Sequence, residues 1–356
     1  LAMGIYGLTQ GVLQLPLGML SDRLGRKRVI VGGLLVFAAG SFAAAAADTL
    51  TGLVVGRALQ GGGAISAVVT ALLADQTRDE VRTKAMALVG ASIGLMFAVS
   101  LVAAPLLIGV GGLPGLFVLT GSLALIGVAV VVWGVPPEPR EHKPVVRGSL
   151  AAVVRHGPTM RLDFGVFILH AVLLAMWVGV PQLLVEAGLS QRHHWWVYLP
   201  AVTLSFFVMA ATLFPLERRG YLRAVFLAAV GLIAAVLAAL ALTAGSHPSI
   251  AVLAVVLFLF FCASNILEAA QPSMASRLAP PEARGTAMGV YNTLQSLGFF
   301  AGGAVGGWLA KHVGVQGLFA TCAALVLLWL VVAWPMRAPV RANSAEEVLA
   351  DEARAT

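Results

Sequence analysis

The stretch "GMLSDRLGRKR" (residues 18–28) places five charged residues and two glycines between two long apolar runs. The run after it, "VIVGGLLVFAAGSFAAAAA" (residues 29–47), has no charged residue and is close to the ~20 apolar residues that a helix needs to cross a bilayer. Residues 224–246 form another uncharged run of this kind. The stretch therefore predicts a short polar loop between two membrane spans.

The composition of the whole chain also indicates a membrane protein. Of its 356 residues, 59% are hydrophobic and 11% are charged, whereas soluble domains carry about 25% charged residues. Backbone groups in lipid must be paired within the protein, and no alternating strand pattern competes with helices. We expect an all-α integral membrane protein with eleven helices, near residues 2–20, 29–47, 50–73, 84–109, 114–135, 161–186, 194–215, 221–244, 249–276, 284–310 and 314–335.

A polar linker separates two halves of the chain. Residues 136–160 are rich in Pro and basic residues, which is typical of a loop with a short amphipathic helix on the membrane surface. We therefore expect an N-terminal helical bundle over residues 1–135, a cytoplasmic linker over 136–160, a C-terminal helical bundle over 161–336 and a cytoplasmic tail over 337–356.

The two halves carry related sequences. "DRLGRKR" (residues 22–28) and "ERRGYLR" (residues 217–223) share an acid, an Arg, a Gly and a closing Arg at a spacing of 195 residues, which indicates an internal duplication. At this spacing, the expected helix over residues 161–186 has no counterpart in the first half. We therefore expect one further helix ahead of residue 1 and twelve spans in a six-plus-six arrangement for the complete protein.

Lys and Arg lie almost entirely on one side of the predicted membrane. The alternate loops that begin with residues 18–28 hold 20 of the 23 basic residues. By the positive-inside rule, this side and the C-terminus are cytoplasmic. The net charge of +7 then reflects topology, and we expect the lipid bilayer, not a nucleic acid, as its partner.

Other functional classes lack their motifs in this sequence. It has no GxxxxGK[ST] phosphate loop, no HExxH, and no Ser or Cys with a base at a known spacing. Cys262 and Cys322 lie in predicted spans, so neither a disulfide nor a metal site is expected. We expect a carrier that is not an enzyme and has no cofactor and no metal. A non-transporting membrane sensor on the same fold is the alternative.

The residues of the opening loop resemble a signature of the major facilitator superfamily, carried by Gly18, Leu20, Ser21, Asp22, Arg23, Gly25, Arg26 and Lys27. A second family signature is matched by Leu53, Arg57, Gln60, Gly61, Gly63 and Ala64. Residues 83–105 and 265–303 are similar to the YajR-like branch of bacterial drug:proton antiporters. The antiporter motif has glycines where this sequence has Ser100 and Ala104.

The resemblance implies the major facilitator fold, with two pseudo-symmetric six-helix bundles. It implies a monomeric transporter in a bacterial inner (plasma) membrane that exchanges protons for a small organic or drug-like solute by alternating access. A proton symporter or a uniporter for a metabolite such as a sugar is the alternative transport function.

The resemblance also implies that the opening loop is a latch between the halves, formed when the transporter is open to the outside. Asp22 is placed to meet the positive N-terminus of the helix that begins near Arg284, and Arg26 to pair with Asp75. Glycines in the loop permit a close approach and a tight turn. The alternative is that these charges only determine topology. The gating residues are Gly18, Asp22, Arg23, Gly25, Arg26 and Asp75.

Ionisable groups inside spans cost ~2.5 to 3.5 kcal/mol on insertion scales and mark transport pathways. Glu268 is the predicted proton carrier, and a static hydrogen bond between helices or direct contact with substrate is its alternative. Arg57 is expected to tune a carboxylate or relay protons. His170 is expected to titrate near neutral pH, against the alternative of a packing residue.

Polar residues of other spans are predicted to line a central cavity that binds the small-molecule substrate. Hydrogen bonds that hold helices together are the alternative role for them. The predicted substrate-binding residues are Tyr6, Gln10, Gln14, Gln60, Asn265, Gln271, Tyr291, Asn292 and Gln295. Gly298, Gly302 and Gly306 form a stripe of small residues that lets another helix approach closely.

Overall fold

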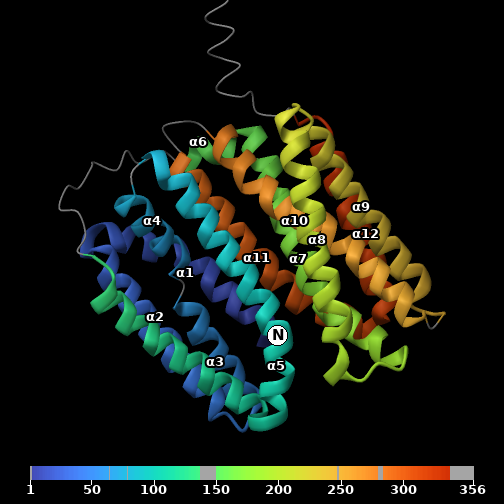
Figure 1. Cartoon of the computed structure of the whole chain (residues 1–356), viewed down its shortest axis with the longest axis horizontal. Coiled ribbons are helices and arrows are strands. Elements are labelled where there is room, and N and C mark those ends of the chain that lie inside the picture. Colours follow the sequence, from blue (N-terminus) through green and yellow to red (C-terminus); the bar gives the residue numbers. More distant parts are fainter. Residues whose placement is uncertain are drawn as a thin grey trace, which may run out of the picture.

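The computed structural model describes residues 2–63, 65–77, 79–136, 150–246, 248–279 and 284–336, and these residues are largely helical, with no strand among them (Figure 1). The helices of the first half are α1 (Ala2–Leu24), α2 (Arg26–Ala45), α3 (Leu50–Gly62), α4 (Ser66–Gln76), α5 (Asp79–Ala129) and the π-helical turn η1 (Val130–Gly134). Those that follow are α6 (Leu150–Arg155), α7 (Gly157–Glu186), the 3-10 turn η2 (Gln191–His193), α8 (Trp195–Arg218), α9 (Leu222–Thr243), α10 (Ile250–Leu278), α11 (Arg284–His312) and α12 (Gly314–Ala333).

The helix expected over residues 50–73 is interrupted, because α3 ends at Gly62 and α4 begins at Ser66. A Cβ at Gly63 would lie 2.5 Å from the carbonyl oxygen of Gly33 on α2. Glycines weaken a helix, and they also let the backbone of α2 approach at this point. The helix therefore breaks where it crosses α2.

The helices expected over residues 84–109 and 114–135 are joined in α5. Gly112 has φ 64° and ψ −171°, so it leaves the helical region and divides α5 into two arms. Glycine adopts this conformation without a steric penalty. This turn lies in the loop that was expected between those two helices. The short helix expected within residues 136–160 is α6, while residues 137–149 of that linker lie outside the described part of the chain.

Eight helical segments of the described residues are long and apolar enough to cross a membrane. They are residues 26–45, 50–73, 106–134, 157–186, 191–217, 222–243, 250–275 and 314–333. α1 and α11 are long enough but are not among them, because glycines and polar side chains lower their hydropathy. These two helices pack against each other between the halves.

Equivalent turns in the two halves support the internal duplication. Gly25 has φ 92° and Gly220, which lies 195 residues later, has φ 83°. Just after each turn, a basic side chain donates to a carbonyl beyond the last helix of its half. Lys27 Nζ lies 2.8 Å from the oxygen of Val135, and Arg223 Nε lies 2.6 Å from the oxygen of Met336.

The stripe of small residues on α11 is where α7 approaches. A Cβ at Gly298 would overlap the carbonyl oxygen of Phe167, and one at Gly302 would overlap that of Ala171. Another face of α11 packs as closely on α1 in the first half (Figure 1). The expectation of close helix approach at this stripe is confirmed.

Burial differs between the halves. α7 contacts α10, α11 and α12, and most of its apolar residues belong to the large core of the second half. The buried hydrophobic cluster described in the first half is small and consists of Val29, Ile30, Val68 and Leu72. Polar residues that α7 directs inward are therefore shielded by protein from lipid.

Candidate functional site

Three polar side chains from three helices of the second half meet at His170. Its Nε2 lies 2.9 Å from Oε1 of Glu268 on α10 and 2.7 Å from Nε2 of Gln295 on α11. The ring of Phe299 stands edge-on to the imidazole at a centroid distance of 4.8 Å. The sequence predicted each of the three polar residues as part of a site, but not that they contact one another.

The hydrogen bonds of His170 determine where it can take up a proton. Its Nδ1 lies 2.7 Å from the carbonyl oxygen of Val166. A carbonyl only accepts, so Nδ1 carries a hydrogen, and Nε2 is the ring nitrogen that faces Glu268 and Gln295. A neutral imidazole accepts at Nε2 from protonated Glu268 or from the Gln295 amide. A charged imidazolium donates to ionised Glu268, and the amide must then turn its oxygen toward the ring.

Exposure differs sharply between the side chains of His170 and Glu268. The side chain of His170 is 1% exposed, whereas that of Glu268 is 39% exposed. Glu268 is therefore the member of the pair that can be reached from outside the protein. This geometry fits two of the roles expected for Glu268, a static hydrogen bond between helices and a proton carrier.

Two other predicted residues of the second half lie elsewhere. Asn265 Nδ2 donates to Ser205 Oγ on α8 at 2.7 Å, which joins α10 to α8. This contact matches the alternative role of a bond between helices. Asn292 is half-buried on α11, where its backbone oxygen accepts from Ser296 Oγ at 3.1 Å.

A second group of polar residues is buried nearer the basic loops. Asp163 and Gln271 have no exposed surface, and Tyr291 is 3% exposed. Neither carboxylate oxygen of Asp163 and neither amide atom of Gln271 has a hydrogen-bond partner among the described residues. Sequence reasoning missed Asp163, although an acid at the start of the span expected over residues 161–186 was a visible signal.

Arg57 on α3 lies in a separate network of the first half. Its Nη1 donates to Gln60 Oε1 at 2.7 Å, and Gln60 Nε2 donates to Ser41 Oγ at 2.7 Å. The guanidinium lies over the ring of Tyr6, 4.8 Å from its centroid, which is a cation–π contact. No carboxylate of the described residues pairs with Arg57, so the expected tuning of an acid has no partner there.

Gln14 connects the halves. Its Nε2 donates to Ser66 Oγ on α4 at 3.1 Å, and its Oε1 accepts from Ser296 Oγ on α11 at 3.5 Å. Gln10, one turn earlier on α1, is half-buried. The polar face of α1 therefore follows the contact with the second half.

The expected pair in the opening loop is present. Arg26 Nε lies 2.6 Å from Asp75 Oδ2 at the end of α4, and the φ of 92° at Gly25 provides the tight turn. The expected close approach at Gly18 is wrong, because a Cβ there would meet no described atom within 4 Å. Asp22 and Arg23 end α1, but their side chains lie outside the described part of the structure.

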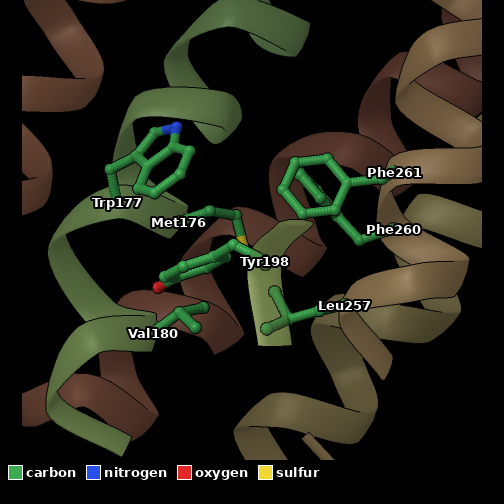
Figure 2. Close-up of a pocket in the computed structure, with 7 residues that line it drawn as sticks. All are labelled: Met176, Trp177, Val180, Tyr198, Leu257, Phe260 and Phe261. Carbon is green, nitrogen blue, oxygen red and sulfur yellow. The ribbon is translucent and has the colours of Figure 1, made fainter. Parts of the chain in front are cut away.

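An apolar pocket lies between α7, α8 and α10 (Figure 2). It is small and is lined by Met176, Trp177, Val180, Tyr198, Leu257, Phe260 and Phe261. The Tyr198 hydroxyl is buried without a hydrogen-bond partner among the described residues. The sequence did not predict this pocket, because its residues look like ordinary core residues. Within the described residues, no three His, Cys, Asp or Glu side chains are grouped to hold a metal ion.

Comparison with known families decides the class of protein. The sequence pattern of the Major Facilitator Superfamily matches residues 1–303 and, in a second match, residues 215–354. The chain belongs to the major facilitator superfamily.

This major facilitator has relatives among bacterial transport proteins. It is 42% identical over 348 residues to the inner membrane transport protein YajR of Escherichia coli (strain K12), an alignment that covers 97% of this chain and 76% of YajR. It is 30% identical over 340 residues to the multidrug resistance protein MdtH of Aeromonas hydrophila, covering 89% of this chain and 79% of MdtH. The YajR-like branch predicted from the motifs is thereby confirmed.

A solved structure with the same fold is that of the human organic anion transporter MFSD10 (TETRAN). The TM-score is 0.67 at 19% sequence identity, over 93% of this chain and 83% of that one. The expected fold class is confirmed, and the major facilitator is an all-α membrane transporter with multiple spans.

Proposed function

We propose that this major facilitator exports a small organic or drug-like solute in exchange for protons. The observation that carries the proposal is the contact of His170, Glu268 and Gln295, a proton-binding cluster inside the helices of one half. Intramembrane ionisable groups that pair with one another are typical of proton pathways. The similarity to a multidrug resistance protein supports efflux of drug-like solutes.

Competition for one carboxyl group would couple the two fluxes. Protonated Glu268 is neutral and donates to Nε2 of neutral His170. Ionised Glu268 attracts a solute with hydrogen-bond donors or a positive charge, and it is the more exposed partner of the pair. Binding of the solute then favours loss of the proton, and binding of the proton favours release of the solute. The two move in opposite directions when the site faces each side of the membrane in turn.

Alternating access requires the halves to move at their contacts. Gly4, Gly7 and Gly11 of α1 lie directly against α11, and we call this contact the glycine seam. Its small residues on the α1 side suit rocking of one bundle on the other. The Arg26–Asp75 pair joins the end of α4 to the start of α2 and is proposed to hold the gate closed in one state. The polar residues around Arg57 and Gln14 are proposed to face the solute from the first half.

We place the basic loops and the C-terminus in the cytoplasm, and the protein in a bacterial inner membrane as a monomer. The excess of Lys and Arg on alternate loops supports this orientation. The proposed cycle moves a solute and a proton without covalent chemistry, so we propose neither an enzymatic activity nor a cofactor.

The test uses everted membrane vesicles that contain the protein and hold an acid interior. A panel of drug-like cations, neutral organic compounds and sugars is added, and the fluorescence of a pH-gradient dye is followed. Glu268→Gln removes the proton site with little change in shape. Glu217→Gln is the matched control, because Glu217 lies at the end of α8 in an ion pair with Arg277 at 2.9 Å.

We expect at least one solute to discharge the gradient with the wild type and with Glu217→Gln, but not with Glu268→Gln. Discharge that survives in Glu268→Gln would place the proton carrier elsewhere. Uptake of a solute without discharge would instead identify a uniporter, and acidification driven by a solute would identify a symporter.

A further inference from the structure

α7, α10 and α11 each contribute a polar residue at two different depths. At 1.5 Å per residue, Asp163, Gln271 and Tyr291 all lie ~9 to 11 Å from the ends of their helices nearest the basic loops. By the same count, His170, Glu268 and Gln295 lie ~15 to 20 Å from those ends. We call the first set the inner layer. The three helices therefore carry a second polar layer between the proton-binding cluster and the basic face.

The inner layer is linked electrostatically to that cluster. Tyr291 on α11 interacts electrostatically with both Asp163 and Glu268, so it is near both carboxyl groups. The residues follow the same helix faces: Asp163 and His170 are two turns apart on α7, and Gln271 and Glu268 are one turn apart on α10. A path that leaves Glu268 toward the basic face meets this layer.

Within the part of the chain that the structure describes, the other elements packed on α7 present no charge to Asp163. α12 brings the indole of Trp329, which packs on Gly165, and its Nε1 has no hydrogen-bond partner among the described residues. α6 buries Val153 and leaves Arg155 exposed, and η2 lies at the opposite end of α7. Arg161 on α7 is exposed. Among the described residues, the ionisable neighbours of Asp163 are thus Tyr291 and, beyond it, Glu268.

A static role does not explain this layer. An ionised carboxylate without a partner is very costly in a protein interior, so such groups become neutral or find a counter-charge. Asp163 has neither a cation nor a hydrogen-bond donor among the described residues. Buried polar groups in native proteins are nearly always hydrogen-bonded, yet Asp163 and Gln271 at the same depth are not. An apolar residue would pack there at lower cost.

We propose that Asp163 is a second proton site, protonated in this conformation, which takes the proton that leaves the His170–Glu268 pair and passes it to the basic face. Gln271 and Tyr291 supply the hydrogen-bond partners of Asp163 when the helices rearrange. The step is a transfer of one proton between carboxyl groups and makes or breaks no other covalent bond. This inference rests on the proposed proton coupling and extends it by one residue.

The first test is infrared difference spectroscopy of the full chain in liposomes across a range of pH. The C=O stretch of a protonated carboxylic acid is separate from the carboxylate bands. At neutral pH we expect such a band in the wild type that is lost in Asp163→Asn and kept in Glu217→Gln and Glu268→Gln. In the unmutated protein, isotope-labelled aspartate must shift the same band, which makes the result independent of whether the variant folds. Absence of any aspartate-dependent band would overturn the proposal.

The second test is the vesicle assay with each solute that discharges the wild-type gradient. Asp163→Asn is expected to lose this discharge while the same solute still equilibrates across the membrane. Discharge at the wild-type rate in Asp163→Asn would remove Asp163 from the proton path and leave the proposed function intact. If no solute discharges the wild-type gradient, the proposed function fails, whatever the infrared band shows.

Discussion

Replacing Gly7 on α1 with Ala tests how tightly the two halves are joined. A Cβ at Gly7 would lie 2.8 Å from the backbone oxygen of Ser296 and 3.1 Å from the backbone nitrogen of Phe300 on α11. The first distance is about 0.6 Å short of ordinary van der Waals contact. Both of these atoms belong to the backbone of α11, so a side-chain rotation cannot relieve the overlap, and α1 and α11 must separate.

Gly18→Ala on the same helix is the matched control, because its Cβ would meet no described atom within 4 Å. Both substitutions gain the helix propensity of Ala, roughly 1 kcal/mol. Only Gly7→Ala adds overpacking, which costs about 1 to 3 kcal/mol. We therefore expect Gly7→Ala to be less stable than Gly18→Ala by about 1 to 3 kcal/mol.

The assay is the apparent melting temperature of both variants in one detergent, followed by the loss of monodisperse protein on gel filtration. A difference of this size corresponds to roughly 2 °C or more, taking about 2 to 4 °C per kcal/mol for chains of moderate size. Transport by Gly7→Ala should also slow, because the added methyl group holds α1 and α11 apart. If Gly7→Ala melts at or above Gly18→Ala, the close seam between α1 and α11 is refuted.

Three further predictions concern the polar contacts. Arg26→Gln and Asp75→Asn should each lose most transport. The free energy of unfolding should change by less than about 1 kcal/mol, because the pair is partly exposed. Exchanging the two residues should restore part of the transport rate, and no restoration would argue against a latch. His170→Gln keeps a hydrogen-bonding group but binds no proton, so the pH dependence of transport should flatten, whereas an unchanged profile would assign His170 to packing. Tyr198→Phe removes a hydroxyl without a partner among the described residues. The free energy of unfolding should therefore stay equal or rise by up to about 1 kcal/mol. A clear loss of stability would mean that the hydroxyl makes a hydrogen bond.

The membrane class and most helix positions could be predicted from the sequence, because most spans are apolar over most of their length wherever they pack. The turn at Gly25 and its repeat at Gly220 were also readable, since a positive φ favours glycine in any fold. The family motifs indicated the pairing of Arg26 with Asp75. Each of these features depends on neighbours in the sequence or on a local signature.

The tertiary structure alone decided which helix faces meet. His170 and Glu268 were both predicted to couple protons, but their contact across 98 positions follows from the packing of α7 against α10 and α11. The burial of Asp163 and the open space beside Gly18 likewise depend on neighbouring helices. Periodicity along a sequence shows which residues share one face of a helix. It does not show what lies opposite that face, and burial, hydrogen bonding and charge all depend on what lies there.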